Sequence, residues 1–369
     1  MKKSISVQSP GRINIIGEHT DYNDGYVLPA AIDKKTIMSL EINGSDQMVY
    51  ATAKNFDDHF SFNLRNFNPV EDGWPNYIMG VVHEIQKLGG TMTGFNLTFE
   101  GDVPIGGGMS SSASLECSLA FAINELFGLG LDKWQMIKAS QMAEHNFVGI
   151  KCGIMDQFAS MMGKKGQVML LDCRSLEFEY FPFYLGDYCL VLLNTNVSHT
   201  LASSEYNTRR QECEAGIKII QNQLDEIYSL RDVDLEWIKN NKSSFKDKLY
   251  NRCLHVISEN HRVLETTKAL KANQFERVGE FMFASHYSLQ HNYEVSCPEL
   301  DFLVDIGRLH KYVLGSRMMG GGFGGCTINI VHKNHLNQYI EECASAYNEK
   351  FAIDLTPYEV SIEDGTREI

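Results

Sequence analysis

A glycine- and serine-rich stretch at residues 101–116 constrains this chain most, because it is typical of a strand end, a tight turn and a helix start in succession. Gly106, Gly107 and Gly108 permit positive φ angles and let main-chain N–H groups approach a bulky anion closely. Apolar residues then recur at helical spacing through Leu126, which predicts a largely buried helix with its positive end at the glycines. The stretch therefore indicates a phosphate-binding loop, with an ordinary glycine turn before a helix as the alternative.

The residues that join the glycines to this helix are also informative. Met109 is followed by Ser110, Ser111 and Ser112, and serine is a favoured N-cap residue, so we expect these hydroxyls to cap the helix. The loop is not a Walker A motif, because no Gly-Lys-Ser or Gly-Lys-Thr follows the glycines. A cation that offsets phosphate charge must therefore come from elsewhere.

The overall charge narrows the class of partner. The 369 residues carry a formal net charge of −14, whereas binding to nucleic acid or to a membrane surface would favour a basic face. The chain begins without a signal-peptide pattern, has no apolar run of membrane-spanning length, and holds nine cysteines without C-x-x-C spacing. We therefore expect a soluble cytoplasmic protein with reduced thiols, a small-molecule ligand and no obligate protein partner.

The order of predicted elements indicates two α/β halves. The first half has strand patterns at 4–7 (ended by Pro10 and Gly11), in a run through residue 42 that residues 25–29 lead into, at 48–64 (a hairpin) and at 166–173. Its helix patterns are at 76–88, 115–126, 132–147 and 155–162. The second opens with a continuous buried-strand pattern at 188–195, is mainly helical over 203–310 with a loop at 240–244, and ends with elements at 325–331, 336–351 and 358–362. We predict domains of residues 1–186 and 187–369 that share an extensive interface.

Residues 11–25 have a composition suited to a binding pocket. Arg12, Glu18, His19 and Asp21 lie close together between glycines, which is poor for a core and suits a pocket lined by a loop. A solvated turn is the alternative.

A second glycine run resembles a dinucleotide motif but lacks its context. Gly320, Gly322 and Gly325 match the spacing G-x-G-x-x-G, yet the strand-like residues 327–331 follow instead of a helix. We expect instead a backbone turn against which a ligand or the first domain's loop lies closely, or an ordinary turn into a strand.

Two residues are candidate ligands for a divalent metal ion. Ser112 at the helix start and Glu144 on the following helix would both reach one Mg²⁺ if these helices pack side by side, and Mg²⁺ takes few protein ligands. Glu144 is otherwise an ordinary residue on a helix surface. Trp74, just before a helix, is either a core residue or a platform for a nucleobase.

Asp156 is a candidate for phosphoryl-transfer chemistry. Its position at a helix start favours a carboxylate on structural grounds alone. Transfer to a hydroxyl also needs a group that orients or deprotonates the nucleophile, and cations that offset charge on the phosphoryl group, which Asp156 and Arg12 would supply together. An Arg neighbour would favour the ionised carboxylate, so the sequence leaves open whether Asp156 acts as a base or mainly positions the hydroxyl.

These blocks together resemble the galactokinases of the GHMP small-molecule kinase superfamily. Gly-Arg-Ile-Asn-Ile-Ile-Gly-Glu-His-Thr-Asp-Tyr at 11–22 is similar to the galactokinase signature, Val-Pro-Ile-Gly-Gly-Gly-Met-Ser-Ser-Ser-Ala at 103–113 to the superfamily phosphate motif, and Met-Gly-Gly-Gly-Phe-Gly-Gly-Cys at 319–326 to its third motif. Segments 152–157, 171–175 and 201–206 also look like galactokinase segments, so the resemblance spans nearly the whole chain in order.

The resemblance implies a fold, a reaction and a set of roles. The fold is a two-domain α/β (α+β) GHMP kinase with its active site in the cleft between the domains, and the reaction is ATP-dependent phosphorylation of the C1 hydroxyl of D-galactose. The implied roles are sugar binding by Glu18, His19, Asp21, Gly153 and Tyr206; catalysis by Asp156 with Arg12; ATP phosphates on Gly106, Gly107, Gly108, Met109, Ser110, Ser111 and Ser112; adenine near Trp74; and Mg²⁺ on Ser112 and Glu144.

Two other functions remain open. A kinase of a related sugar, such as N-acetylgalactosamine, galacturonate or L-arabinose, would differ around the 2- and 6-substituents. A non-catalytic sensor of sugar and nucleotide would bind both ligands without turnover, although residues 110–113 and Asp156 are those of an active enzyme.

Overall fold

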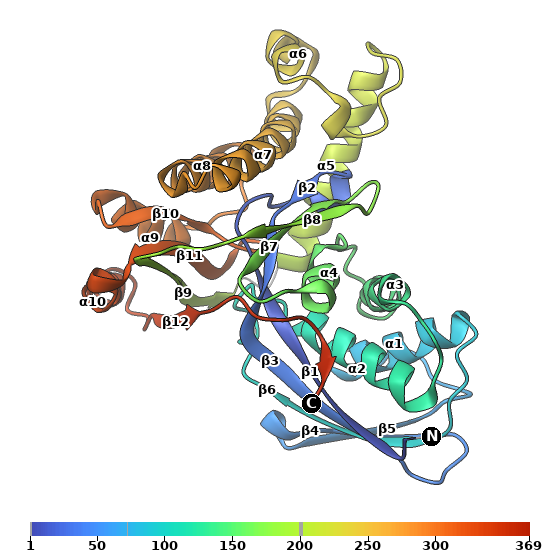
Figure 1. The fold of residues 1–369 in the computed structure, drawn as a ribbon. Coiled ribbons are helices and arrows are strands. Elements are labelled where there is room, and N and C mark those ends of the chain that lie inside the picture. The colour runs from blue at the N-terminus through green and yellow to red at the C-terminus, as the bar shows by residue number, and fades with distance from the viewer. Residues whose placement is uncertain (1, 72, 199–201) are drawn as a thin grey trace.

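The chain forms mixed sheets and helices in two halves, as the element pattern predicts (Figure 1). This computed structural model describes residues 2–71, 73–198 and 202–369, so Leu201 of the 201–206 segment lies outside the described residues. Among the residues that it describes, no helix is long and apolar enough to cross a bilayer.

The first half is built on a six-stranded sheet with helices packed on it. The strand order is β13 (Arg367–Glu368), β1 (Ser4–Asn14), β3 (Pro29–Ile42), β6 (Phe95–Gly101), β4 (Met48–Ala53) and β5 (Asp58–Asn63). The helices are α1 (Pro75–Lys87), α2 (Ser111–Phe127), α3 (Lys133–Ala143) and α4 (Met155–Met162). Helix α2 lies along β1 and β3, and its buried residues share one core with theirs. The phosphate loop therefore joins two well-anchored elements, β6 and α2.

The prediction that Pro10 and Gly11 end the first strand is wrong. Strand β1 continues to Asn14, and the register with β3 shifts between Pro10 and Arg12 as in a β-bulge. A Cβ on Gly11 would lie 2.7 Å from the Met109 carbonyl oxygen, so glycine lets the phosphate loop approach the strand closely. Arg12 is thus fixed on a strand and not on a loop.

A small sheet of three strands, β2 (Tyr26–Val27), β7 (Gln167–Asp172) and β8 (Phe178–Pro182), completes this half. The strand run expected to follow residues 25–29 and to continue through Ile42 is β3, and the residues that lead into it contain the short strand β2. Strand β8 was not predicted, because its mixed residues lack a strand period.

The second half is built on a four-stranded sheet ordered β10 (Val313–Met318), β11 (Gly324–His332), β9 (Tyr188–Ser198) and β12 (Thr356–Val360). Leu190 and Leu192 belong to one core and Val191 and Leu193 to another, because successive side chains of β9 point to opposite faces. This explains the continuous apolar run of the predicted strand. Strand β10 was not predicted.

Helices make up most of the second half, as expected: α5 (Ala202–Gln221), α6 (Leu235–Asn240), α7 (Asp247–Lys271), α8 (Phe275–Ser288), α9 (Pro298–Leu309) and α10 (Leu336–Phe351). The loop predicted at 240–244 is largely a 3-10 turn, Lys242–Ser244. The helix predicted at 132–147 is α3, which Asp132 and Gln135 cap with reciprocal hydrogen bonds, followed by a π-helical turn at Glu144–Val148.

The two halves are joined by more than the chain crossing at residue 186. Strand β13, at the C-terminus, pairs with β1 of the first sheet. The turn between β10 and β11 also lies against the phosphate loop: a Cβ on Gly320 would be 3.2 Å from the Gly108 carbonyl oxygen. The expectation that this turn receives the loop of the first half is confirmed, while a boundary between 1–186 and 187–369 remains a proposal.

Candidate active site

The phosphate loop has the left-handed backbone that its glycines predict. Gly106 and Gly108 have φ angles of 71° and 73°, and helix α2 begins at Ser111 directly after them. Ser110 itself has a φ of 57°, and within the described chain its side chain makes no capping hydrogen bond. Its hydroxyl donates instead to Asp156 Oδ2 at 2.5 Å. The prediction that these serines cap the helix is therefore wrong for Ser110, whose hydroxyl faces the candidate catalytic carboxylate.

Arg12 and Asp156 form a bidentate ion pair. Arg12 donates from Nε to Asp156 Oδ1 at 2.7 Å and from Nη2 to Oδ2 at 2.9 Å, and its Nη1 donates to the carbonyl of Gly108. Burial lowers the pKa of the Arg12 guanidinium, but the neighbouring carboxylates, Asp156 first and then Glu18 and Asp21, together outweigh burial and the net shift is upward. Arg12 is therefore a fixed cation that holds Asp156 and the phosphate loop in one arrangement.

A cavity of about 130 Å³ collects most of the predicted sugar and catalytic residues. Its lining is Arg12, Glu18, His19, Asp21, Ser112, Glu144, Ile150, Cys152, Gly153, Met155, Asp156, Tyr206, Gly320 and Gly321. The structure thus brings together residues from β1, the segment after it, the starts of α2 and α4, α5 and the glycine turn of the second half. Every predicted sugar-binding residue lines this cavity.

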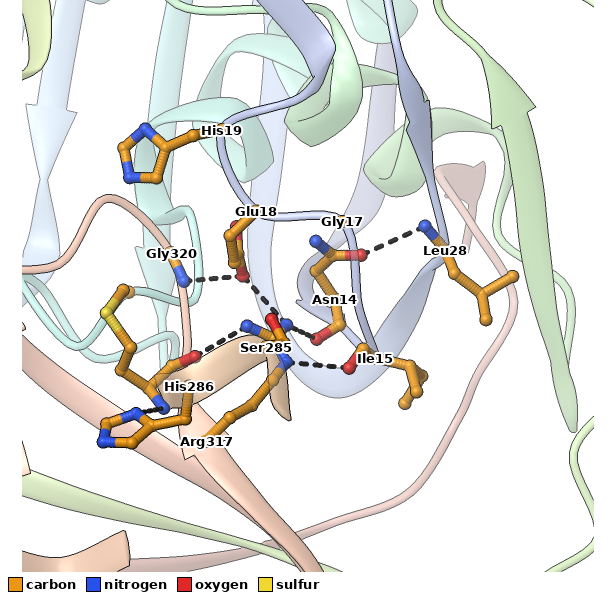
Figure 2. Close-up of polar contacts among 12 residues, drawn as sticks. Asn14, Ile15, Gly17, Glu18, His19, Leu28, Ser285, His286, Arg317 and Gly320 are labelled. Atoms are coloured by element: carbon orange, nitrogen blue, oxygen red, sulfur yellow. Dashed lines mark hydrogen bonds and ion pairs between the residues drawn. The ribbon is translucent and has the colours of Figure 1, made fainter. Parts of the chain in front are cut away.

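Glu18 is held by a residue that sequence reasoning missed. Arg317 on β10, which is fully buried, donates to Glu18 Oε1 at 3.0 Å and to the carbonyls of Asn14 and Ile15, and the Gly320 N–H donates to the same Glu18 oxygen at 2.9 Å. Figure 2 shows both donors pointing toward the Glu18 carboxylate. Glu18 is therefore positioned mainly by the second half of the chain. No strand was predicted at β10, so no sequence signal pointed to Arg317.

His19 is a neutral ring at the end of a buried chain of hydrogen bonds. Its Nε2 lies 3.2 Å from the Gly321 carbonyl, which only accepts, so Nε2 carries the proton and Nδ1 accepts from the Tyr22 hydroxyl at 2.8 Å. Tyr22 in turn contacts the Tyr293 hydroxyl at 2.8 Å. Burial lowers the pKa of His19 to about 3. Tyr22 and Tyr293 were missed by sequence reasoning because aromatic residues of this kind are usually core residues.

Asp21 and Gly153 are in close contact. A Cβ on Gly153 would lie 1.9 Å from Asp21 Oδ2, so only glycine leaves space for this carboxyl group. Burial, followed by repulsion from Asp156, raises the pKa of Asp21 to about 7. Glycine at position 153 thus makes room for Asp21, while a contact from Gly153 to the sugar stays a prediction.

A larger cavity, about 1010 Å³ in volume, meets the first at Ser112. It is lined by Thr36, Asn55, Phe56, Asp57, Asp58, Gly73, Trp74, Tyr77, Phe99, Gly101, Asp102, Val103, Pro104, Ile105, Ser111, Ser112, Leu115 and Tyr358. The Trp74 ring packs edge-on against Phe99, at 5.3 Å between centroids, and its Nε1 donates to Asp58 Oδ2 at 2.7 Å. Trp74 therefore both packs on the core and lines a cavity of nucleotide size, and its use as a platform for a nucleobase stays a prediction.

Ser112 and Glu144 are adjacent, as expected if α2 and α3 pack side by side. The Ser112 hydroxyl donates to Glu144 Oε1 at 2.9 Å, and Gln157 Nε2 contacts the same oxygen at 3.2 Å. Burial, followed by repulsion from Asp156, raises the pKa of Glu144 to about 7. A hydroxyl and a carboxylate at this spacing fit a Mg²⁺ ion that keeps water and phosphate oxygens as its other ligands, and such a cation would favour the ionised form of Glu144.

Met109 is the one predicted phosphate-loop residue whose side chain is in the core. It is fully buried, and its carbonyl accepts the Arg12 main-chain N–H at 3.0 Å. A contact from Met109 to a ligand would therefore have to come from its backbone.

Comparison with known proteins decides the family. The family model "GHMP kinases N terminal domain" matches residues 76–164, "GHMP kinases C terminal" matches residues 266–349, and "Galactokinase galactose-binding signature" matches residues 2–41. Curated galactokinases of Thermotoga maritima and Bacillus subtilis are 41% and 40% identical to this chain, over 99% and 98% of it and 100% and 93% of their own lengths. The chain belongs to the galactokinase family.

A solved galactokinase has the same fold. The crystal structure of Lactococcus lactis galactokinase complexed with galactose matches with a TM-score of 0.95 at 34% identity, covering 100% of this chain and 96% of that one. The mevalonate kinase of Methanococcus jannaschii, at 18% identity and a TM-score of 0.71 over 98% of both chains, shares the fold. The two-domain fold implied by the sequence is confirmed.

Proposed function

We propose that this chain transfers the terminal phosphoryl group of ATP to the C1 hydroxyl of D-galactose, giving galactose 1-phosphate and ADP. The observation that carries the proposal is the meeting of two cavities at Ser112, one of nucleotide size and one lined by Glu18, His19 and Asp21, in a galactokinase family member. The Asp156 and Arg12 pair lines the smaller cavity.

Asp156 would orient the attacking hydroxyl and accept its proton. The paired Arg12 holds Asp156 in place, and Ser110 donates to the same carboxylate, so two donors fix its direction. Both oxygens of Asp156 already accept hydrogen bonds, so we propose that it mainly positions the hydroxyl and that proton transfer to it is late.

Sugar specificity would come from polar groups that are already fixed. Glu18 is held by Arg317 and Gly320, and His19 by Tyr22 and Gly321, so neither can turn freely toward a differently placed hydroxyl. A sugar with the wrong hydroxyl orientation would leave buried partners unpaired, which is a strong basis for rejection. Asp21, Gly153 and Tyr206 complete this proposed set.

The phosphates of ATP would lie on main-chain groups from Gly106 to Ser112 at the start of α2, with the base toward Trp74. Ser112 and Glu144 would hold Mg²⁺, which when bound offsets the charge of the phosphates. Arg12 would supply positive charge on the sugar side. We also propose a cytoplasmic location, supported by use of ATP and by nine cysteines that are all free thiols.

The test is ADP release by the purified chain with Mg·ATP, without sugar and with D-galactose, D-glucose, N-acetylgalactosamine, galacturonate or L-arabinose. Strong stimulation by D-galactose alone is expected. Stimulation by another sugar instead would leave the reaction class and replace the substrate. Galactose binding without ADP release would favour a sensor, which the retained Asp156 and Arg12 pair argues against.

A further inference from the structure

A separate cavity lies among α6, α7 and α8 and shares no lining residue with the two cavities of the candidate active site. These helices gather in the helical part of the second half (Figure 1). The cavity volume is about 630 Å³, which lies within the range of small-molecule sites. The proposed phosphoryl transfer uses none of its lining residues.

Two arginines and Lys239 bring positive charge to this cavity, and Lys239 is already paired with Glu236 at 2.8 Å. Arg308 lies over the Phe283 ring, 4.8 Å from its centroid, and donates from Nη2 to the Phe283 carbonyl at 3.0 Å. Arg262 donates from Nε to Glu259 Oε2 at 2.6 Å, while its Nη2 is buried and has no hydrogen-bond partner among the described residues. A buried donor without a partner is costly, and guanidinium groups bind carboxylates and phosphates well. The charge favours an anion.

Beside the polar residues Lys239, Ser258, Ser288 and Asn292, the lining has an apolar part. Leu235, Leu254, Phe283 and Tyr287 contribute to it, and Tyr287 is 57% exposed. The acidic residue of the lining, Glu280, is already paired with Arg277. A ligand that satisfies both features carries a carboxylate or phosphate group on a flat apolar body.

The first route from this cavity to the sugar site runs through Glu259. The carboxylate that Arg262 holds is fully buried, and its Oε1 accepts the Gly17 main-chain N–H at 3.0 Å and the Ser285 hydroxyl at 2.7 Å. Arg262 thus positions the group that fixes the backbone immediately before Glu18.

The second route runs through His255. Its Nε2 lies 3.1 Å from the Glu18 carbonyl, which only accepts, so Nδ1 accepts from the Ser288 hydroxyl at 2.9 Å. Ser288 and Asn292 line the cavity, and Asn292 donates to Ser288 at 3.2 Å. Both routes therefore end on Gly17 and Glu18, at the wall of the sugar cavity.

We propose that this cavity is a second ligand site, for a small organic anion with an apolar body, and that its occupation weakens sugar binding. An anion on Arg262 competes with Glu259 for the guanidinium, and Glu259 then holds the Gly17 backbone less firmly. The coupled sugar is D-galactose, so this part of the proposal rests on the proposed function. By linkage, galactose must weaken binding of the anion by the same factor.

Calorimetric titration of the full chain with phenyl phosphate, inorganic phosphate and phenol tests the site. We expect phenyl phosphate to bind more tightly than either fragment, and the substitution Arg308→Gln to weaken it about tenfold or more, as loss of a charge-assisted contact should. Lys350→Gln is the matched control, because Lys350 also lies over a ring, 4.1 Å from the centroid of Phe302 on α9, but does not line the cavity. It should leave phenyl phosphate binding unchanged.

Galactose titrations with and without phenyl phosphate test the coupling. We expect saturating phenyl phosphate to raise the Kd of galactose about fivefold or more, within the usual range of allosteric coupling. This effect should be weakened by Arg308→Gln and kept by Lys350→Gln. Equal binding of phenyl phosphate to wild type and Arg308→Gln overturns the site, and an unchanged galactose Kd overturns the coupling. If galactose does not bind at all, the proposed function has failed, while the phenyl phosphate titration still decides on the site.

Discussion

At the scale of single residues, Asp156 and Arg12 depend on each other for both charge and position. In Asp156→Asn the side chain keeps its shape and one oxygen for Arg12, but it can no longer accept a proton. We expect kcat to fall about 100-fold or more, with the chain folded and ATP binding nearly intact. Single-turnover ADP formation with saturating galactose measures this, and near-normal turnover would contradict the role of Asp156.

Asp156→Ala, compared with Asp156→Asn, shows how much the side chain at this position contributes to the stability of the fold. It leaves the buried Arg12 without its partner, so we expect a further loss of unfolding free energy on the order of 3 kcal/mol, measured by urea denaturation. The Asn variant serves as its control. Equal stability of the two variants would show that Arg12 finds water or another acceptor.

Residue types and spacing predicted which residues belong to this site better than they predicted the contacts that these residues make. Arg12, Asp156, Ser112 and Glu144 were predicted because each residue type fits a step of phosphoryl transfer, and the structure brings them together. Arg317 was not predicted, because a buried arginine 299 positions from Glu18 is recognisable only once the two halves are folded together. Long-range contacts of this kind leave no local signal.

At the scale of elements, the spacing of apolar residues predicted the long helices, and a continuous apolar run predicted the central strand β9. Short strands such as β8 and β10 were missed. Residues 313–318 carry a glycine, a serine and an arginine and show no alternation, so only pairing with β11 makes them a strand. The end of β1 was also misjudged, since a bulge carries the chain past Pro10.

The turn between β10 and β11 offers a test at this scale. Gly320 has a φ of 81°, and an added Cβ would meet the Gly108 carbonyl oxygen at 3.2 Å, so Gly320→Ala both strains the backbone and presses on the phosphate loop. We expect a loss of about 1–2 kcal/mol in unfolding free energy and a raised KM for ATP.

Gly44→Ala is the matched control for this turn. Gly44 has nearly the same φ, 79°, and an added Cβ would have no atom within 4 Å. It should lose similar stability by urea denaturation, while steady-state kinetics should show an unchanged KM for ATP. An equal effect of the two substitutions on this KM would show that the contact between the turn and the phosphate loop is not important.

At the scale of the whole molecule, the two halves share one site and are joined by strand pairing. The C-terminal strand β13 pairs with β1, so the sheet of the first half is completed by the last residues of the chain. The sequence could not predict this pairing, because two residues of strand carry no pattern and the partners lie 361 and 359 positions apart. It implies that the halves do not fold as independent units.

The pH dependence of stability provides a final test of the assembled cavity. The pKa of Asp21 is raised from 3.8 to about 7, so the folded chain keeps a proton there that the unfolded chain releases. The stability from this proton is fully present below pH about 4 and is lost as the pH rises to about 7.

In Asp21→Asn the side chain is neutral throughout. Relative to wild type, the variant should therefore gain stability between pH 4 and 7, by at most about 4 kcal/mol at 1.4 kcal/mol per pKa unit, and then level off. Urea denaturation at several pH values measures the difference, and calorimetry should show weaker galactose binding because an amide nitrogen replaces one oxygen of the carboxyl group. A difference in stability that does not change with pH would mean that Asp21 is ionised in the folded chain, and the sugar cavity would then have to carry two neighbouring carboxylate charges, at Asp21 and Asp156.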